Sequence, residues 1–315
     1  MKPRFHLPPA AIIGREEMAD GASIRTLLLP HEAPLANLLL LTGRADFHEK
    51  WAGAIQELHE AGFAIAAFDW RGQGGSTRLT QSGAGHIDSF DTWLSDLDRL
   101  SGWALGALSG DRWLALGHSM GGHLLTRWLV DPARRALPLR RALSGAVLSS
   151  PFYGLAGPVA MRAAAMRLAP IQVARGLGDH FAWGQRPYGA LQQRPERQFL
   201  LTGSRAHFED EGLWASHRPE LATGGVSWGW IKAFADSEAI LEAQPIEEVE
   251  LPLLMLLADR ERLVDNKSAL RIAARLPHVR HRLFAGAAHE LLREADEVRR
   301  EAISSVVHFA REVTA

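Results

Sequence analysis

The sequence predicts an α/β fold in which a mainly parallel sheet carries helices on both faces. Short apolar runs typical of strands alternate with longer runs typical of helices, and this alternation indicates a parallel sheet with helical crossovers. The chain has 315 residues, which is enough for one large core or for a core with an insertion. A helix-rich stretch near the middle interrupts the alternation and indicates such an insertion.

The elements of the predicted sheet follow one another in a regular order. The expected strands are 23–29, 36–41, 64–68, 112–117, 142–149, 252–257 and 279–284. The expected helices are 49–61, 90–105, 120–130, 267–276 and 290–311. Between 151 and 242 the sequence is helix-rich and has no convincing strand. We therefore expect a core made of residues 1–150 and 243–315, and a helical cap, residues 151–242, inserted after a sheet strand.

One helical run within the expected cap, residues 159–175, has two interpretations. It carries Met161 and Met166 among alanines. The run can pack on the core as an ordinary helix, or it can form a flexible apolar wall of a substrate cleft, a role that methionine suits. The sequence leaves both open.

Composition excludes several classes of function. The 35 basic and 36 acidic residues give a net charge of −1, so no strong field attracts nucleic acid or an anionic bilayer. The absence of cysteine excludes disulfides, thiolate metal sites and cysteine nucleophiles. The N-terminal sequence lacks the apolar region of a signal peptide, and no run approaches the roughly 18 apolar residues of a membrane span. We expect a cytoplasmic protein with no nucleic-acid partner.

The most informative stretch is Gly117-His118-Ser119-Met120-Gly121. It follows an apolar strand-like run and precedes a helix-like run, which is the context of a nucleophile elbow. Its glycines permit a turn sharp enough to lift the Ser119 hydroxyl above the sheet edge, and the helix behind it offers free N–H groups. A second Gly-X-Ser-X-Gly match, centred on Ser227, lacks a preceding strand and is interpreted as a loop that leads into a helix.

A serine nucleophile needs a base, and in this arrangement the chain order is serine, acid, histidine. His289 follows the run 279–284 and a small-residue turn, which places its imidazole beyond the last strand at the same sheet edge as Ser119. We predict His289 to be the general base, since its pKa near neutrality suits it to take and return a proton. His118 and His123, which flank the elbow, are weaker candidates.

Three carboxylates after the expected strand 252–257 compete for the role of the acid. Glu261 is followed by one spacer and two apolar residues, which is the usual arrangement, and it is the preferred candidate. Asp259 lies two residues earlier and is the alternative. Asp265 follows the apolar pair, where it could also cap the helix that begins near Lys267.

The tetrahedral intermediate requires N–H donors directed at its oxyanion. One is expected from the backbone of Met120, directly after the nucleophile. The other is expected from the loop after strand 36–41, where Gly43 permits an unusual turn and the N–H of Arg44 is favoured, with Ala45 as the alternative.

Two further segments invite other interpretations. The glycine-rich run 69–76 lacks the Gly-Lys-Ser/Thr ending of a phosphate loop, so a structural turn at the same sheet edge is expected. His207 and His217, with three acidic residues between them, match no usual metal-ligand spacing, so a solvated cap loop is expected there.

Together these segments resemble the α/β-hydrolase superfamily, and more narrowly its bacterial lysophospholipase and monoacylglycerol lipase branch, the serine aminopeptidase-like hydrolases. The supporting segments are 41–50, 68–76, 117–122, 261–266 and 286–292. The resemblance implies a triad of Ser119, Glu261 and His289, a helical cap over the cleft, and neither cofactor nor metal. Two departures stand out: many relatives have His-Gly at Thr42-Gly43, and many have aspartate at Glu261.

The resemblance implies a carboxylic ester hydrolase that forms an acyl-enzyme, with a lysophospholipid or monoacylglycerol as substrate. A short-chain carboxylesterase, a peptidase-like amidase and a non-catalytic binding protein on the same fold are the alternatives. A haloalkane or epoxide hydrolase is disfavoured because it needs a carboxylate at the position of Ser119. A cytoplasmic location peripheral to the inner membrane, with transient contact at the membrane surface, is compatible with such a substrate. The sequence does not specify the oligomeric state.

Overall fold

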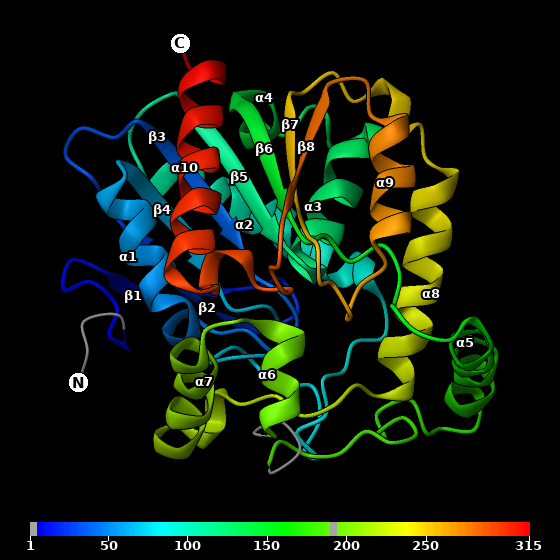
Figure 1. The fold of residues 1–315 in the computed structure, drawn as a ribbon. Helices are drawn as coiled ribbons and strands as arrows, with labels where there is room; N and C mark the ends of the chain where they lie inside the picture. The colour runs from blue at the N-terminus through cyan, green and yellow to red at the C-terminus, as the bar shows by residue number, and fades with distance from the viewer. Residues whose placement is uncertain (1–4, 190–193) are drawn as a thin grey trace.

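The computed structural model, which describes residues 5–189 and 194–315, has one eight-stranded sheet in the order β1-β2-β4-β3-β5-β6-β7-β8 (Figure 1). The strands are β1 (Ile12–Glu17), β2 (Ser23–Leu29), β3 (Ala36–Leu41), β4 (Phe63–Phe68), β5 (Trp113–His118), β6 (Leu143–Ser149), β7 (Leu253–Ala258) and β8 (Val279–Phe284). β2 pairs antiparallel with both β1 and β4, and every other pair in this sheet is parallel. The predicted class, a mainly parallel sheet with helices on both faces, is confirmed.

The sheet separates two apolar cores because alternate side chains of each strand point to opposite faces. Leu38 and Leu40 of β3 pack in one core, whereas Leu39 and Leu41 pack in the other. The first core is covered by α1 (Ala52–Glu60) and α10 (Asp296–Val313). The second is covered by α2 (Phe90–Ala107), α3 (Met120–Val130), α4 (Pro138–Ala142), α8 (Trp228–Ala243) and α9 (Asn266–Arg275). Figure 1 shows these two helical layers on either side of the strands.

Between β6 and β7 the chain forms α5 (Val159–Ala174), α6 (Pro195–Leu201), α7 (Arg205–His217) and α8. We call residues 151–242 the β6–β7 segment. Figure 1 shows α5 on one side of this part of the molecule and α6 and α7 on the other. Within the described ranges the segment contains helices and isolated bridges but no strand. The division into core and cap stays a prediction.

The structure corrects several predicted elements. β1 was not expected; its sequence, IIGREE, puts Ile12 and Ile13 at the surface, so it lacks the buried alternation that marks an inner strand. The expected helix 290–311 is a 3₁₀ turn followed by α10, because the Glu294 carboxylate accepts the N–H groups of Ala288 and Ala295 at 2.7 Å and holds the intervening chain out of helical form.

The expected helix 49–61 likewise begins as a 3₁₀ turn, His48–Trp51, before α1. Among the helices of the described ranges, none is long and apolar enough to cross a membrane.

Candidate active site

Four loops meet at the carboxyl edge of the parallel strands. Ser119 follows β5, Arg44 follows β3, Glu261 follows β7, and His289 follows β8. Since β3 pairs with β5 and β6 lies between β5 and β7, these loops leave the same edge of the sheet. Open α/β sheets bind their ligands at this edge. Segments far apart in sequence are therefore assembled into one site.

Ser119 sits in a strained backbone conformation between β5 and α3. Its φ of 52° and ψ of −117° lie outside the regions that L-residues favour. Neighbouring glycines make this turn possible: a Cβ at Gly121 would lie 2.2 Å from the carbonyl oxygen of Leu41, and a Cβ at Gly117 would lie 2.7 Å from that of Gly121. The Ser119 N–H donates to the carbonyl of Ser149 at 2.9 Å, which fixes the turn against β6.

His289 and Glu261 form a buried pair. The His289 Nδ1 lies 2.7 Å from Glu261 Oε2, and Glu261 Oε1 accepts the N–H groups of Leu263 at 2.8 Å and Val264 at 3.1 Å. Burial works to raise the pKa of Glu261, but the charge and hydrogen bond of His289 and the two N–H donors lower it overall. Burial likewise works to lower the pKa of His289, but Glu261 outweighs it and raises that pKa above its ordinary value.

The other two carboxylates of this loop lie elsewhere. Asp259 is exposed, and its Oδ2 accepts the N–H of Gly286 at 3.2 Å. Asp265 caps α9, where its Oδ1 accepts the N–H of Lys267 at 3.0 Å. The structure thus brings Glu261, rather than Asp259, into contact with the His289 ring.

The three expected or neighbouring donors of the loop after β3 differ in whether an acceptor takes their N–H groups. The N–H of Gly43 donates to Asp46 Oδ2 at 2.7 Å, and the N–H of Ala45 donates to the Gln73 side chain. Within residues 5–189 and 194–315, no acceptor takes the N–H of Arg44 or that of Met120. Both residues line the cavity described next. The alternative donor, Ala45, is already engaged.

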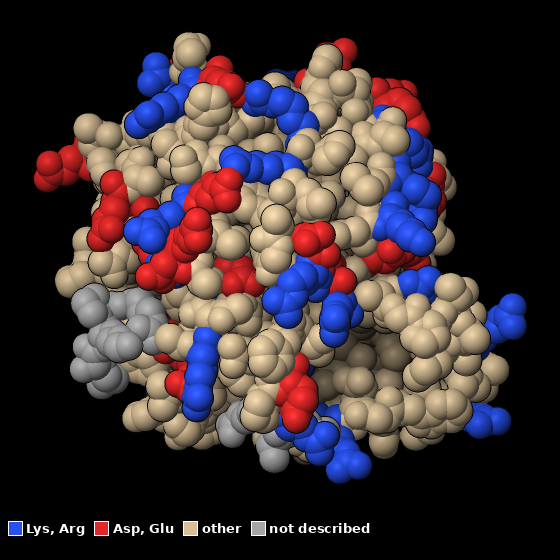
Figure 2. All heavy atoms as spheres, viewed as in Figure 1, with Lys and Arg blue, Asp and Glu red and all other residues tan. Residues whose placement is uncertain are grey.

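A cavity of about 690 Å³ opens beside Ser119 and His289, both of which line it. Most of its other lining residues are apolar, and they include Met161 and Met166 of α5. Met161 is 72% exposed, so α5 forms an open wall of the cavity rather than a buried core helix. Figure 2 shows a hollow in the surface over this part of the molecule. The volume lies within the range typical of small-molecule sites.

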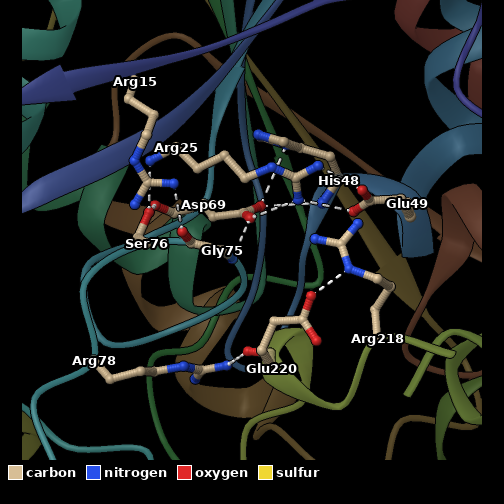
Figure 3. A network of polar contacts seen from close by, with 10 residues as sticks. All are labelled: Arg15, Arg25, His48, Glu49, Asp69, Gly75, Ser76, Arg78, Arg218 and Glu220. Atoms are coloured by element: carbon tan, nitrogen blue, oxygen red, sulfur yellow. Dashed lines mark hydrogen bonds and ion pairs between the residues drawn. The ribbon is translucent and has the colours of Figure 1, made fainter. Parts of the chain in front are cut away.

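The glycine-rich segment 69–76 forms the expected structural turn (Figure 3). The Asp69 carboxylate is fully buried, and it accepts the N–H groups of His48 at 3.0 Å and Gly75 at 2.7 Å and a bond from Arg25 Nη1 at 3.3 Å. A Cβ at Gly74 would lie 2.4 Å from this carboxylate. Asp69 therefore fixes the 3₁₀ turn at His48, which directly follows the loop after β3.

Ser227 serves as a helix cap. It is fully buried, and its hydroxyl accepts the N–H of Trp230 at 3.1 Å at the start of α8. The expected loop around His207 and His217 is instead the helix α7, so that expectation was wrong. The buried residues of this helix, His207, Asp210, Glu211 and Ala215, follow a helical spacing, so Glu211 lies on its buried face. No cluster of side chains in the described part of the chain has the composition of a metal site.

Sequence reasoning missed one cluster of charged residues and one further arginine at the cavity. The Lys50 ammonium, buried in the 3₁₀ turn after β3, pairs with Asp46 at 2.7 Å, Glu290 at 2.9 Å and Glu211 at 3.1 Å. Arg197 of α6 also lines the cavity. Asp46, Lys50 and Glu290 lie in the segments 41–50 and 286–292, but the sequence does not show that Glu211 and Arg197 join them, because that proximity depends on how α6 and α7 pack against the core.

The chain is similar in sequence to a known protein family and to named relatives. The family model described as serine aminopeptidase, S33, matches residues 32–296. A protein of Haemophilus influenzae named "Probable lysophospholipase L2" is 29% identical over 90% of this chain and 87% of its own length. "Lysophospholipase L2" of Escherichia coli K12 is 28% identical over 86% of this chain and 79% of its own length.

Solved structures share the fold. A soluble variant of monoglyceride lipase from Saccharomyces cerevisiae, in complex with a substrate analog, has a TM-score of 0.75 at 17% identity and covers 97% of both chains. The monoacylglycerol lipase of Paleococcus ferrophilus has a TM-score of 0.68 at 20% identity, over 92% of this chain and 99% of its own. The chain therefore belongs to the serine aminopeptidase, S33, family, and it is a serine ester hydrolase on an α/β-hydrolase fold.

Proposed function

We propose that this serine ester hydrolase is a lysophospholipase that releases the single acyl chain of a lysophospholipid. The observation that carries the proposal is the largely apolar cavity of about 690 Å³ that Ser119 and His289 line together. A cavity of this character holds one acyl chain with its ester at the serine. The relatives named lysophospholipase L2 support the same substrate class.

In the proposed reaction, the Ser119 Oγ attacks the ester carbonyl carbon while His289 accepts the serine proton. His289 then donates that proton to the leaving glycerol oxygen, and an acyl-enzyme remains. Water attacks the acyl-enzyme with His289 as base, which releases the fatty acid and restores Ser119. Glu261 holds the imidazole in the required tautomer and stabilises its protonated form.

The oxyanion of each tetrahedral intermediate is assigned to the N–H groups of Met120 and Arg44. Both are without an acceptor in the described part of the chain, and both line the cavity. Because such donors are held in place before reaction, each contributes about 2.7–4 kcal/mol to lowering the barrier.

The test is a hydrolysis profile of the purified protein. Its substrates are p-nitrophenyl esters of graded chain length, lysophosphatidylcholine and a monoacylglycerol with the same acyl chain. Ser119→Ala is the variant, and Ser227→Ala is the matched control because it alters the other Gly-X-Ser-X-Gly segment. We expect turnover of long-chain substrates, lost in Ser119→Ala and retained in Ser227→Ala.

Two results would contradict the proposal. Turnover that Ser119→Ala leaves unchanged would remove the nucleophile assignment. Activity confined to short p-nitrophenyl esters would retain Ser119 as nucleophile and make the protein a short-chain carboxylesterase.

A further inference from the structure

The cavity has walls of two different kinds. The apolar wall comes mainly from α5 and α8, for example Met161, Met166 and Phe234. The charged wall comes from the loop and 3₁₀ turn after β3 and from α6 and α7, and its arginines are Arg44 and Arg197. A third arginine of the lining, Arg162, belongs to α5 on the apolar side, and its Nη1 donates to the carbonyl of Leu155. Figure 1 shows α5 and α8 on one side of the site and α6 and α7 on the other. A substrate with an apolar tail and a charged head matches this division.

The carboxylates of the charged wall already have cationic partners. Asp46, Glu211 and Glu290 each lie within 3.1 Å of the Lys50 ammonium. Glu290 also pairs with Arg293. Three carboxylates thus share two cations, Lys50 and Arg293. Glu211 and Asp46 also attract Arg44 at longer range, but within the described ranges no carboxylate forms an ion pair with Arg44 or Arg197.

Arg44 and Arg197 lack carboxylate partners in the described ranges. The Arg44 guanidinium makes one hydrogen bond, from Nη1 to the carbonyl of Gly224 at 3.0 Å. The side chain of Arg197 has neither hydrogen bond nor ion pair within those ranges, and its Nε is buried without an acceptor. Burial and the nearby charge of Arg197 lower the pKa of Arg44 to about 10, although attraction from Glu211 and Asp46 opposes the shift. The guanidinium groups of Arg44 and Arg197 thus line one cavity, and most of their N–H donors have no acceptor within the described ranges.

We propose that Arg44 and Arg197 form an anion subsite that binds the phosphate of the lysophospholipid headgroup and so selects phospholipid over neutral esters. The inference rests on the proposed function, since it assigns the headgroup end of that same site. Guanidinium groups bind phosphate oxygens through paired N–H donors, which suits two arginines with unused donors.

Substrate chemistry agrees with the placement of Arg44. In a lysophospholipid, the three carbons of glycerol separate the ester oxygen from the phosphate. Arg44 offers its backbone N–H to the ester carbonyl in the proposed mechanism, and its side chain lines the same cavity. One residue can therefore contact both ends of the glycerol, while Arg197 approaches from α6.

The test compares Arg197→Gln with Arg194→Gln. Arg194 precedes the same helix, is exposed, and does not line the cavity, so its substitution changes net charge equally. The kcat/KM is measured on lysophosphatidylcholine and on a monoacylglycerol with the same acyl chain. We expect Arg197→Gln to lower the ratio of these two values about 10-fold or more, mainly through KM, because one charge-assisted contact is lost. Arg194→Gln should leave the ratio unchanged.

Arg197→Lys refines the test, since it retains the charge and loses the paired donors. We expect its ratio to lie between those of the wild type and Arg197→Gln. An equal loss on both substrates in Arg197→Gln would overturn the proposal, because it would indicate a structural role. An unchanged ratio would overturn it as well.

An inhibition assay separates this inference from the proposed function. Dodecylphosphocholine, which has no acyl ester, and laurate are tested as inhibitors of p-nitrophenyl ester hydrolysis. Weaker inhibition by dodecylphosphocholine in Arg197→Gln would support the phosphate subsite even if lysophospholipid is not hydrolysed. If Arg197→Gln instead weakens inhibition by laurate alone, Arg44 and Arg197 bind the carboxylate of the released fatty acid. The phosphate assignment is then wrong.

Discussion

At the scale of single residues, the contact between Glu261 and His289 distinguishes the candidate acids. Glu261 lies 2.7 Å from the imidazole, whereas Asp259 is exposed and bound to Gly286. We predict that Glu261→Gln lowers kcat about 10³-fold or more, since an amide cannot stabilise the imidazolium. Asp259→Asn is the control and should change kcat less than about twofold. A larger loss in Asp259→Asn than in Glu261→Gln would reverse the assignment.

The pH profile is a second readout of the same substitution. Glu261 raises the pKa of His289 above its ordinary value, which is about 6.5. A base must be neutral to accept a proton, so the wild-type kcat/KM should fall as pH drops through this raised pKa. Glu261→Gln removes the charge that raises it, and the acidic limb of the residual activity should move to lower pH. His118, whose ring packs 4.9 Å from that of His289, is not the titrating group, because burial and the charge of His289 lower its pKa to about 4.

At the scale of elements, the turn 69–76 supports the loop that carries Arg44. The Gln73 side chain accepts the N–H of Ala45, a non-glycine residue with φ of 63°, and the Trp70 indole donates to the carbonyl of Thr42 at 2.9 Å. These contacts fix a backbone conformation that the loop would not adopt alone. The turn therefore acts on the site through the loop, without lining the cavity itself.

We predict that Gln73→Ala lowers kcat about tenfold with a smaller change in KM, since the loop loses the bond that orients the Arg44 N–H. The buried N–H of Ala45 left without an acceptor should also cost about 1–3 kcal/mol of the free energy of unfolding. Ser76→Ala is the matched control: it removes bonds to Asp69 and Arg25 in the same turn without touching the loop. Steady-state kinetics and urea unfolding measure both effects. If Ser76→Ala lowers kcat equally, Gln73 has no special positioning role.

The sequence predicted those elements whose pattern is local. β5, the elbow and α3 follow one another within 18 residues, and the glycines around Ser119 are required by steric contacts that any sequence with this turn must meet. β1 was missed because it is an exposed edge strand, and α7 was taken for a loop because its acidic run outweighed its helical character. Arg197 and Glu211 could not be found, since nothing in their neighbourhood shows that α6 and α7 face the cavity.

At the scale of the whole molecule, one buried ion cluster links the β6–β7 segment to the sheet. Lys50 follows β3, Glu290 follows β8, and Glu211 belongs to α7, so the cluster joins three regions of the chain. Coulombic attraction from Lys50 and Arg293 keeps the pKa of Glu290 well below its usual range despite burial. Groups with lowered folded-state pKa values stabilise the protein at neutral pH, and this stabilisation is lost as pH falls below about 4.

We predict that Lys50→Met lowers the free energy of unfolding by about 3–5 kcal/mol at pH 7, because it leaves buried carboxylates without their cation. The difference from wild type should shrink toward pH 4, where the carboxylates of the variant become protonated. Adding Glu211→Gln should recover part of the loss, since one of the unpaired charges is removed. Lys232→Met, which breaks an exposed pair with Asp236, should cost less than about 1 kcal/mol. Urea unfolding at both pH values measures these differences, and a cost for Lys50→Met no larger than that for Lys232→Met would show that the cluster does not hold α7 against the core.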